Sequence, residues 1–402
     1  MNTPAEADKL MRASLPVFGS EDCALGEAHG RVLRVDLRSD RDLPPFDRVT
    51  LDGYALRAAA VAAGRRTFSI QALQAAGMRP FQLGSAPEAC IEVGTGAVLP
   101  EGADCVVPYE DTEAAAGRMQ LRTGAVIPAP GHGVHRRGTD HRKGGVIVPA
   151  GVLLTGREIA AAAAVGAASL KVAQLPKIAV VATGDELVEV GQAVAPHQVR
   201  RSNDHALRAA LVLAGYPRVE RFHLHDMRHE VEHMLWHIIA EFDVVLVCGG
   251  VSKGKFDFLP AELDAQGVRK VFQGVAQRPG KPMWFGVNPE GKPVFALPGN
   301  PVSAYTCLHR YVLPALDQAS GRIPRPVETV QLAAPVSFQP KVAYLLPVKV
   351  SAGPSGTRHA TPDPSNTSGD FAGLVGTDGF VELPADQAEF PAGYAATYWP
   401  WV

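Results

Sequence analysis

The stretch KIAVVATGDE, residues 177–186, decides the fold that the sequence predicts. Its first six residues form a largely apolar run, and a run that is apolar on both faces is typical of a buried parallel strand. Residues 243–248 and 293–297 repeat this pattern. Helical patterns lie between the runs, at about 203–214 and 230–240. We therefore expect βαβ units and a doubly wound sheet.

On either side of this stretch, the composition of the chain changes. Capping boxes at Thr3 to Glu6 and at Thr155 to Glu158 predict two helix starts, the first helix running to about Leu15. Between them, a segment rich in Gly, Pro and short apolar runs indicates a mostly β domain. The predicted fold is multidomain α/β plus β. Its parts are a discontinuous, α-containing N-terminal domain (1–42 with 147–175), an inserted β domain (43–146), an α/β domain (176–320) and a C-terminal β domain (321–402).

The composition excludes several classes of function. The chain has 402 residues, of which 46% are apolar, and its formal net charge is only -2 with both signs interspersed. Such a surface has no field that would attract nucleic acid or an anionic membrane. Its five cysteines are scattered without a CxxC pair, which favours a reducing cytoplasm over a disulfide framework. We see neither a leader peptide nor an apolar run long enough to span a bilayer, so we expect a cytoplasmic protein.

Each of the three apolar strands ends in a turn that carries glycine and polar groups. The carboxyl ends of parallel strands share one edge of a sheet, so the three turns should face a single crevice. Glycine lets the backbone approach a phosphate closely, and free N–H groups at a following helix start favour negative charge. The crevice should therefore bind an anion through Thr183, Gly184, Gly249, Gly250, Ser252, Pro298, Gly299, Asn300, Pro301 and Ser303.

Four carboxylates accompany these turns: Asp185, Glu186, Asp226 and Asp257. Carboxylates beside a phosphate site need a cation between them, most simply Mg²⁺, which prefers oxygen ligands. Arg278 and Lys281 add positive charge where an anhydride would break, as do Lys253 and Lys255. The alternative is that these charged residues form solvated surface pairs.

Two further patterns resemble known sites. Residues 249–255 match G-x-x-x-x-G-K after a strand, but Phe256 stands where a phosphate-binding loop needs Ser or Thr to hold Mg²⁺. His229, His233 and His237 lie at i, i+4 and i+8 on one helical face, a spacing that can hold zinc. A polar helix face is the more common meaning of such a series, and no HExxH arrangement is present.

The motifs of the chain closely resemble those of the molybdopterin molybdenumtransferase family. They are PPFDRVTLDGYA (44–55), TGA (95–97) with PEGAD (100–104), TGDEL (183–187), CGGVSKGKFD (248–257), RPGKP (278–282) and LPGNPVS (297–303). The resemblance follows the same order from the first helix to about Tyr311. It is looser in the C-terminal part, at 367–369, 378–379 and 383–384.

The resemblance implies four domains and an elongated homodimer. The active cleft would lie between the α/β domain of one subunit and the inserted β domain of the other, which would bring Asp52 and Thr95 to it. The α/β domain would resemble the enzyme that adenylylates molybdopterin. From the residues alone, Asp52 before Gly53 is an ordinary turn aspartate.

The resemblance also implies the chemistry. Mg²⁺ would bind the pyrophosphate of adenylylated molybdopterin. Its ligands would be carboxylates among Asp185, Glu186, Asp226 and Asp257. Molybdate, the second substrate, would sit near the turn 298–303 with Ser368 and Arg358 from the last domain. AMP would leave, with Asp52, Thr95, Asp226, Asp257, Arg278 and Lys281 as the catalytic set and Arg137 as a further substrate contact. Transient contacts with the adenylyltransferase or with cofactor-accepting enzymes would follow.

Three positions depart from the family pattern. The family usually has Lys at Arg278, Asp at Arg201 and Arg near His135. Arg278 keeps the charge but presents a planar fork instead of a point charge. His135 weakens one anion contact if it is neutral, and Arg201 reverses a charge near the crevice mouth.

Two other functions stay open at this point. A molybdopterin adenylyltransferase would account for residues 176–316 but not for the inserted β domain. A non-catalytic molybdopterin-binding or assembly scaffold would account for the fold, and the four carboxylates argue against it.

Overall fold

The computed structural model describes residues 1–225, 227–250, 259–353 and 356–402. The chain forms two compact units: residues 1–34, 151–155 and 170–402 make the first, and residues 35–150 and 156–169 make the second. The four-domain boundaries given above stay a prediction. In the described part of the chain, no helix combines the length and the apolar character needed to cross a membrane.

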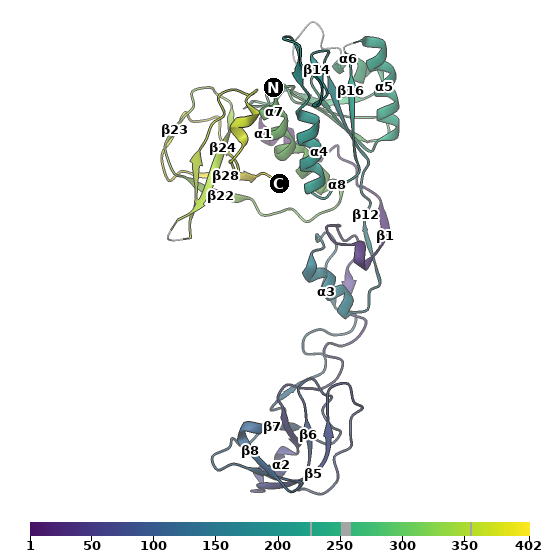
Figure 1. Ribbon diagram of the computed structural model, residues 1–402, viewed down its shortest axis with the longest axis vertical. Coiled ribbons are helices and arrows are strands. Elements are labelled where there is room, and N and C mark those ends of the chain that lie inside the picture. The colour runs from purple at the N-terminus through teal and green to yellow at the C-terminus, as the bar shows by residue number, and fades with distance from the viewer. Residues whose placement is uncertain (226, 251–258, 354–355) are drawn as a thin grey trace. The chain divides into compact units, whose positions relative to one another are not determined.

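The predicted doubly wound sheet is present in the first unit (Figure 1). Its six strands run in the order β16-β13-β17-β21-β20-β18, and the first four are parallel. The last two are antiparallel to their neighbours. The bounds are β13 (Ile178–Thr183), β16 (Val219–Leu224), β17 (Val244–Cys248), β18 (Arg269–Gln273), β20 (Trp284–Val287) and β21 (Pro293–Leu297).

Helices cover both faces of this sheet. Alternate residues of a strand face opposite sides, so Ile178 and Val180 belong to one core while Ala179 and Val181 belong to another. The first core includes residues of α1 (Pro4–Arg12), α4 (Asn203–Leu213), α7 (Pro301–Cys307), the π-helical turn η3 (Leu308–Val312) and α8 (Leu313–Ala319). The second includes residues of α5 (Arg228–Glu241) and α6 (Leu259–Ala265). This arrangement explains why the predicted strands are apolar on both faces.

The predicted start of α1 is confirmed. Thr3 is the N-cap, and its side chain and that of Glu6 form the reciprocal capping box. The helix ends at Arg12 and not near Leu15, and Ala13 is its C-cap residue. Leu15 then packs against the core of the α/β domain outside any helix.

The C-terminal strands close into a ring. β24 (Ala343–Ala352) pairs with β25 (Arg358–Pro362) on one side and with β26 (Gly379–Leu383) on the other. β22 (Glu328–Leu332) and β28 (Ala395–Pro400) complete the circle β24-β25-β22-β28-β26. This predicted β domain has its own core, which includes Leu346, Val381 and Tyr398.

The remaining short elements of the first unit are β1 (Ser20–Ala24), η1 (Leu25–Glu27), β12 (Ser169–Ala173), β14 (Leu187–Val188), β15 (Val199–Arg200), β19 (Gln277–Arg278), β23 (Val336–Ser337), η4 (Phe371–Leu374) and β27 (Glu389–Phe390).

The second unit is built on another six-stranded sheet, in the order β7-β4-β6-β5-β9-β8. Its strands are β4 (Gly53–Leu56), β5 (Thr67–Gln74), β6 (Ala89–Val93), β7 (Cys105–Pro108), β8 (Thr112–Ala115) and β9 (Arg118–Leu121). The other elements of the unit are β2 (Leu37–Arg38), β3 (Arg48–Val49), α2 (Ala58–Ala62), η2 (Tyr109–Asp111), β10 (Val134–His135), β11 (Val146–Val148) and α3 (Gly156–Ala164). The predicted mostly β texture is therefore confirmed for this stretch.

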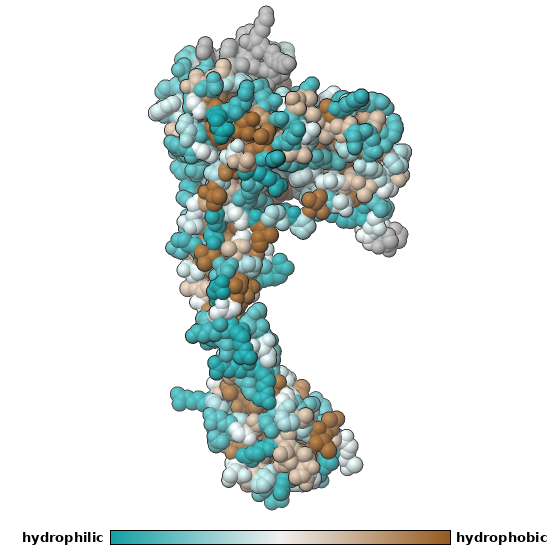
Figure 2. Space-filling model, turned by 180° about the vertical axis from the view of Figure 1, so that it is seen from behind, coloured by the Kyte–Doolittle hydropathy of each residue, from teal (hydrophilic) through white to brown (hydrophobic). Residues whose placement is uncertain are grey.

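The surface matches the mixed composition of the chain. On the face drawn in Figure 2, hydrophobic residues form small groups that hydrophilic residues separate. No single broad apolar area stands out on that face.

Candidate active site

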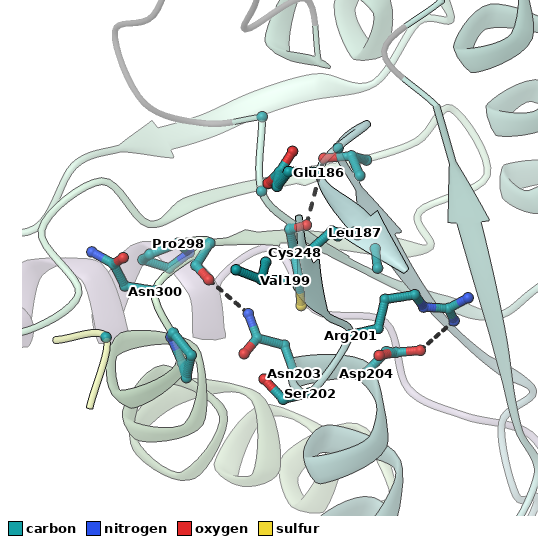
Figure 3. Close-up of a pocket in the computed structure, with 18 of the residues that line it drawn as sticks. Glu186, Leu187, Val199, Arg201, Ser202, Asn203, Asp204, Cys248, Pro298 and Asn300 are labelled. Atoms are coloured by element: carbon teal, nitrogen blue, oxygen red, sulfur yellow. Dashed lines mark hydrogen bonds and ion pairs between the residues drawn. The ribbon is translucent and has the colours of Figure 1, made fainter. Parts of the chain in front are cut away.

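A hollow of about 720 Å³ lies at the carboxyl ends of β13, β17 and β21. Its walls come from the three turns after these strands and from the segment that leads into α4. Figure 3 shows Glu186, Asn203, Cys248, Pro298 and Asn300 around it. The lining includes Thr183, Gly184, Glu186, Arg200, Arg201, Ser202, Asn203, Asp204, Gly249, Gly250, Pro282, Pro298, Gly299, Asn300, Pro301 and Gly369.

Glycines at the end of β17 bring two strand ends close together. Gly249 and Gly250 have φ of 104° and 66°, in the left-handed region that favours glycine. A Cβ on Gly249 would lie 2.7 Å from the Thr183 hydroxyl oxygen, and that hydroxyl donates to the Cys248 carbonyl at 3.5 Å. Any side chain at Gly249 would therefore push these turns apart.

The structure shows two of the four predicted metal carboxylates. Glu186 lines the hollow, and the Asp185 carboxylate lies 3.2 Å from Nδ1 of His225. Asp226, Asp257 and the predicted anion contact Ser252 lie outside the described residues. Within the part of the chain that is described, no group of three or more metal-ligating side chains comes together.

The turn at 298–303 joins the α/β domain to the C-terminal domain. Asn300 is the N-cap residue of α7, and its amide nitrogen donates to the Ser368 hydroxyl at 2.8 Å. The Val302 amide donates to the Ser368 carbonyl at 3.0 Å. Ser368 is thus next to the predicted turn, as the sequence argument expects, whereas Ser303 is buried inside α7.

Asn203 is a residue of the hollow that the sequence reasoning missed. It is the first residue of α4, and its amide nitrogen donates to the Gly299 carbonyl at 2.7 Å (Figure 3). The bond ties the start of α4 to the turn after β21. No apolar period marks such a residue, and the nearest residue that the family comparison singled out is Arg201, two positions earlier.

Neighbouring carboxylates offset the positive charge of Arg201, the residue that departs from the family pattern. The Asp204 side chain is fully buried, and its Oδ2 accepts from the Arg201 guanidinium and from Arg221 at 3.0 Å. Arg201 also lies 3.2 Å from the Glu189 carboxylate. The sequence reasoning foresaw a reversed charge at this point. In the fold, Arg201 and Asp204 both line the hollow as part of an ion-pair cluster in which carboxylates offset the positive charge.

Three predicted cationic residues are absent from the lining given above. Arg278 and Lys281 are exposed, and Pro282 is the residue of their segment that reaches the hollow. Arg358 lies on β25, where its guanidinium pairs with Glu328 and stacks over the Tyr398 ring at 5.0 Å. The structure thus holds Arg358 against the C-terminal domain.

Asp52 and Thr95 meet in the second unit. The Thr95 amide donates to the Asp52 carboxylate at 2.6 Å. Hydrogen bonds from Thr95 lower the pKa of Asp52, so the carboxylate is ionised at neutral pH. The Asp52 side chain thus bonds to the backbone of the loop that carries Thr95.

Arg137 and His135 also have acidic partners in the second unit. The Arg137 guanidinium donates to Asp42 at 3.0 Å. His135 lies 2.9 Å from the Asp140 carboxylate.

Cys248 offers no nucleophile to the hollow. It is buried, and burial raises the pKa of its thiol, so the thiol stays protonated and unreactive. All five cysteines are free and buried.

The fold and the site define the class of protein. Residues 179–318 match the family model described as a probable molybdopterin binding domain. Residues 3–166 match the MoeA N-terminal region, domains I and II, and residues 329–401 match the MoeA C-terminal region, domain IV.

Full-length relatives extend this assignment. The chain is 38% identical to a molybdopterin molybdenumtransferase of Synechocystis over 100% of both chains. It is 32% identical to one of Haemophilus influenzae, over 80% of this chain and 78% of that one. A crystal structure of a molybdopterin biosynthesis MoeA protein from a Pyrococcus species has a TM-score of 0.81 at 31% identity and covers 100% of this chain and 99% of its own. The chain belongs to the molybdopterin molybdenumtransferase family.

Proposed function

We propose that this chain is a transferase that inserts molybdenum from molybdate into adenylylated molybdopterin, with Mg²⁺, and releases AMP. The observation that carries the proposal is the hollow at the strand ends, where glycine backbone, the Glu186 carboxylate and the carboxamides of Asn203 and Asn300 converge. The Synechocystis relative, which matches over the full length of this chain, is a molybdopterin molybdenumtransferase. The adenylylated substrate, the Mg²⁺ dependence and the AMP product are our inference.

The residues of the hollow suit a phosphorylated, anionic substrate. The positive φ values of Gly249 and Gly250 leave room for phosphate oxygens beside the backbone. Two hydrogen bonds hold the turn 298–303 in place. Asn203 donates to Gly299 of the turn, and Asn300 of the turn donates to Ser368. Molybdate is a small oxyanion, and we propose that it binds beside this turn, which lines the hollow. Catalysis then comes mainly from positioning and charge neutralisation.

The donor chemistry fits Mg²⁺. Asp185 and Glu186 lie just after β13, beyond Gly184, and offer the oxygen ligands that Mg²⁺ prefers. We assign Asp226 and Asp257 to the same set from the sequence. When bound, Mg²⁺ would offset the charge of the pyrophosphate oxygens. Arg278 and Lys281, which are exposed, would add positive charge from the rim.

We further propose a homodimer whose cleft combines the hollow of one subunit with Asp52 and Thr95 of the other. The ionised Asp52 carboxylate is already oriented by the Thr95 amide. Arg137 would contact substrate from the same unit, and Arg358 from the C-terminal domain. The buried free cysteines suit a cytoplasmic protein, which would meet the adenylyltransferase and the cofactor-accepting enzymes transiently.

The decisive experiment incubates the purified full chain with adenylylated molybdopterin, Mg²⁺ and molybdate, and measures AMP by chromatography. We expect AMP only when molybdate and Mg²⁺ are both present. Asp257→Ala should lower the rate at least about a hundredfold, because a charge-stabilising group is lost. Asp264→Ala, which removes an exposed carboxylate on α6, is the matched control and should keep the full rate.

Other outcomes separate the alternatives. Consumption of ATP with free molybdopterin would identify an adenylyltransferase. Binding of adenylylated molybdopterin without any AMP would identify a scaffold. If Asp257→Ala keeps full molybdate-dependent and Mg²⁺-dependent release of AMP, our assignment of this carboxylate is wrong.

A further inference from the structure

Two histidines on the solvent face of α5 lie at the spacing of metal ligands. Nε2 of His233 and Nε2 of His237 are 3.3 Å apart, and the two rings meet at 68°. Both residues are exposed. They are one turn apart on the helix, so their side chains rise from the same face.

The packing of α5 fixes this face toward solvent. Val231, Leu235, Ile238 and Ile239 are buried in the core beneath the sheet, at i, i+4, i+7 and i+8. The helix therefore cannot rotate about its axis without exposing these side chains. His233 and His237 stay on the outside, and the backbone holds them one above the other.

The separation of the two nitrogens matches one coordination geometry. A tetrahedral Zn²⁺ with Zn–N bonds of about 2.0–2.1 Å holds two ligating nitrogens about 3.3–3.4 Å apart. Ligands at right angles on the same bond length would be about 2.9 Å apart. The observed 3.3 Å agrees with the tetrahedral value.

We propose that His233 and His237 form a binding site for one divalent transition-metal ion, Zn²⁺ in particular, with water in its remaining positions. Neutral imidazole is a ligand for Zn²⁺, whereas Mg²⁺ prefers oxygen. The site is separate from the carboxylates of the hollow, so it does not depend on the proposed function. It has two protein ligands, in keeping with the described residues holding no group of three.

Calorimetric titration of the full chain with Zn²⁺, in an excess of Mg²⁺, tests the proposal. We expect one Zn²⁺ per chain. His233→Asn and His237→Asn should each weaken binding at least about tenfold, because the second imidazole binds intramolecularly once the first is engaged. His29→Asn, which removes another exposed histidine, should leave the affinity unchanged.

The fluorescence of Trp236 provides a signal from the immediate surroundings of the site. Its ring lies 4.8 Å from that of His237 and is 59% exposed. Cu²⁺, which binds the same ligands and quenches nearby indole emission, should quench the wild-type chain more than Trp236→Phe. His237→Asn should remove the same part of the quenching. Equal Zn²⁺ affinity in the wild type and both histidine variants, with circular dichroism showing them folded, would overturn the proposal.

Discussion

His309 shows how burial selects one protonation state at the scale of a single residue. Its side chain is 3% exposed, its Nδ1 donates to the Tyr305 carbonyl at 2.9 Å and its Nε2 accepts from the Val402 amide at 3.2 Å. A proton on Nε2 would face the Val402 N–H group. Burial lowers the pKa of His309 to about 4.

The lowered pKa of His309 predicts how the stability of the fold depends on pH. In the unfolded chain the pKa of His309 returns to about 6.5, so the unfolded state binds more protons as the pH falls below that value. The free energy of unfolding should therefore decrease by about 2 kcal/mol between pH 7 and pH 5 through this residue. Urea unfolding, followed by tryptophan fluorescence, measures it, since the Trp401 ring lies 4.9 Å from His309.

His309→Gln isolates the effect. This variant should lose less stability between pH 7 and pH 5 than the wild type, because the titrating group is gone. His29→Gln, at an exposed position, should behave as the wild type does. Identical pH dependence in His309→Gln and the wild type would contradict the prediction.

Arg201 illustrates how a charge at the hollow depends on its partners. Arg201→Ala would leave the fully buried Asp204 carboxylate with Arg221 as its remaining cation. We expect a loss of about 2 kcal/mol in the free energy of unfolding, less than for a buried charge left without any partner. Arg200→Ala, which removes an exposed neighbour, should cost far less. Equal unfolding midpoints for the two variants would show that the cluster does not stabilise the fold.

At the scale of elements, β4 depends on a glycine that the sequence motif contains. Gly53 follows Asp52 directly, and β4 pairs with β6 on one side and with β7 on the other. A Cβ on Gly53 would overlap the Val107 carbonyl oxygen of β7. The glycine is therefore required by the close approach of β7 and not by an unusual φ.

Gly53→Ala should destabilise the second unit by about 3 kcal/mol, because one strand must shift away from the other. The same shift should lower the rate of AMP release, since Asp52 moves with β4. Gly26→Ala is the control, because no atom lies within 4 Å of its added Cβ. Thermal unfolding of both variants measures the difference. A melting temperature for Gly53→Ala equal to that of Gly26→Ala would rule out this explanation of the glycine.

Helices and strands with a clear hydrophobic pattern could be predicted from the sequence. The residues at which they end were predicted less accurately. The runs at 177–182, 243–248 and 293–297 became β13, β17 and β21, because residues buried on both faces must be apolar throughout. The first helix stops short of Leu15 since the chain turns there to pack Leu15 on the core. Closure of the C-terminal ring could not be read from the sequence, because strand pairing between distant segments leaves no local period.

At the scale of the whole molecule, we propose that two subunits share a cleft. The carboxylates Asp52 and Asp257 would then act in one cleft from different chains. Neither subunit alone would hold a complete site.

Subunit mixing tests this arrangement. Asp52→Ala and Asp257→Ala should each be inactive alone. After the two are mixed and allowed to exchange subunits, one of the two clefts in each mixed dimer is intact, so about a quarter of the wild-type rate should return. AMP release measures the rate, and light scattering measures the mass of the assembly. No recovery, with subunit exchange shown by differently tagged chains, would mean that both residues act from the same chain.

The sequence by itself determined which strands are buried, where glycines and carboxylates follow them, and which family the motifs resemble. These are local properties, since burial on both faces and a left-handed φ each act on single residues and their neighbours. The tertiary structure decided which side chains meet. Asn203 bonds to Gly299, Ser368 reaches Asn300, and Asp204 neutralises Arg201, because folding brings their segments together. It also kept Arg358 beside Glu328 and Tyr398, because a side chain pairs with the charge and ring nearest to it in space.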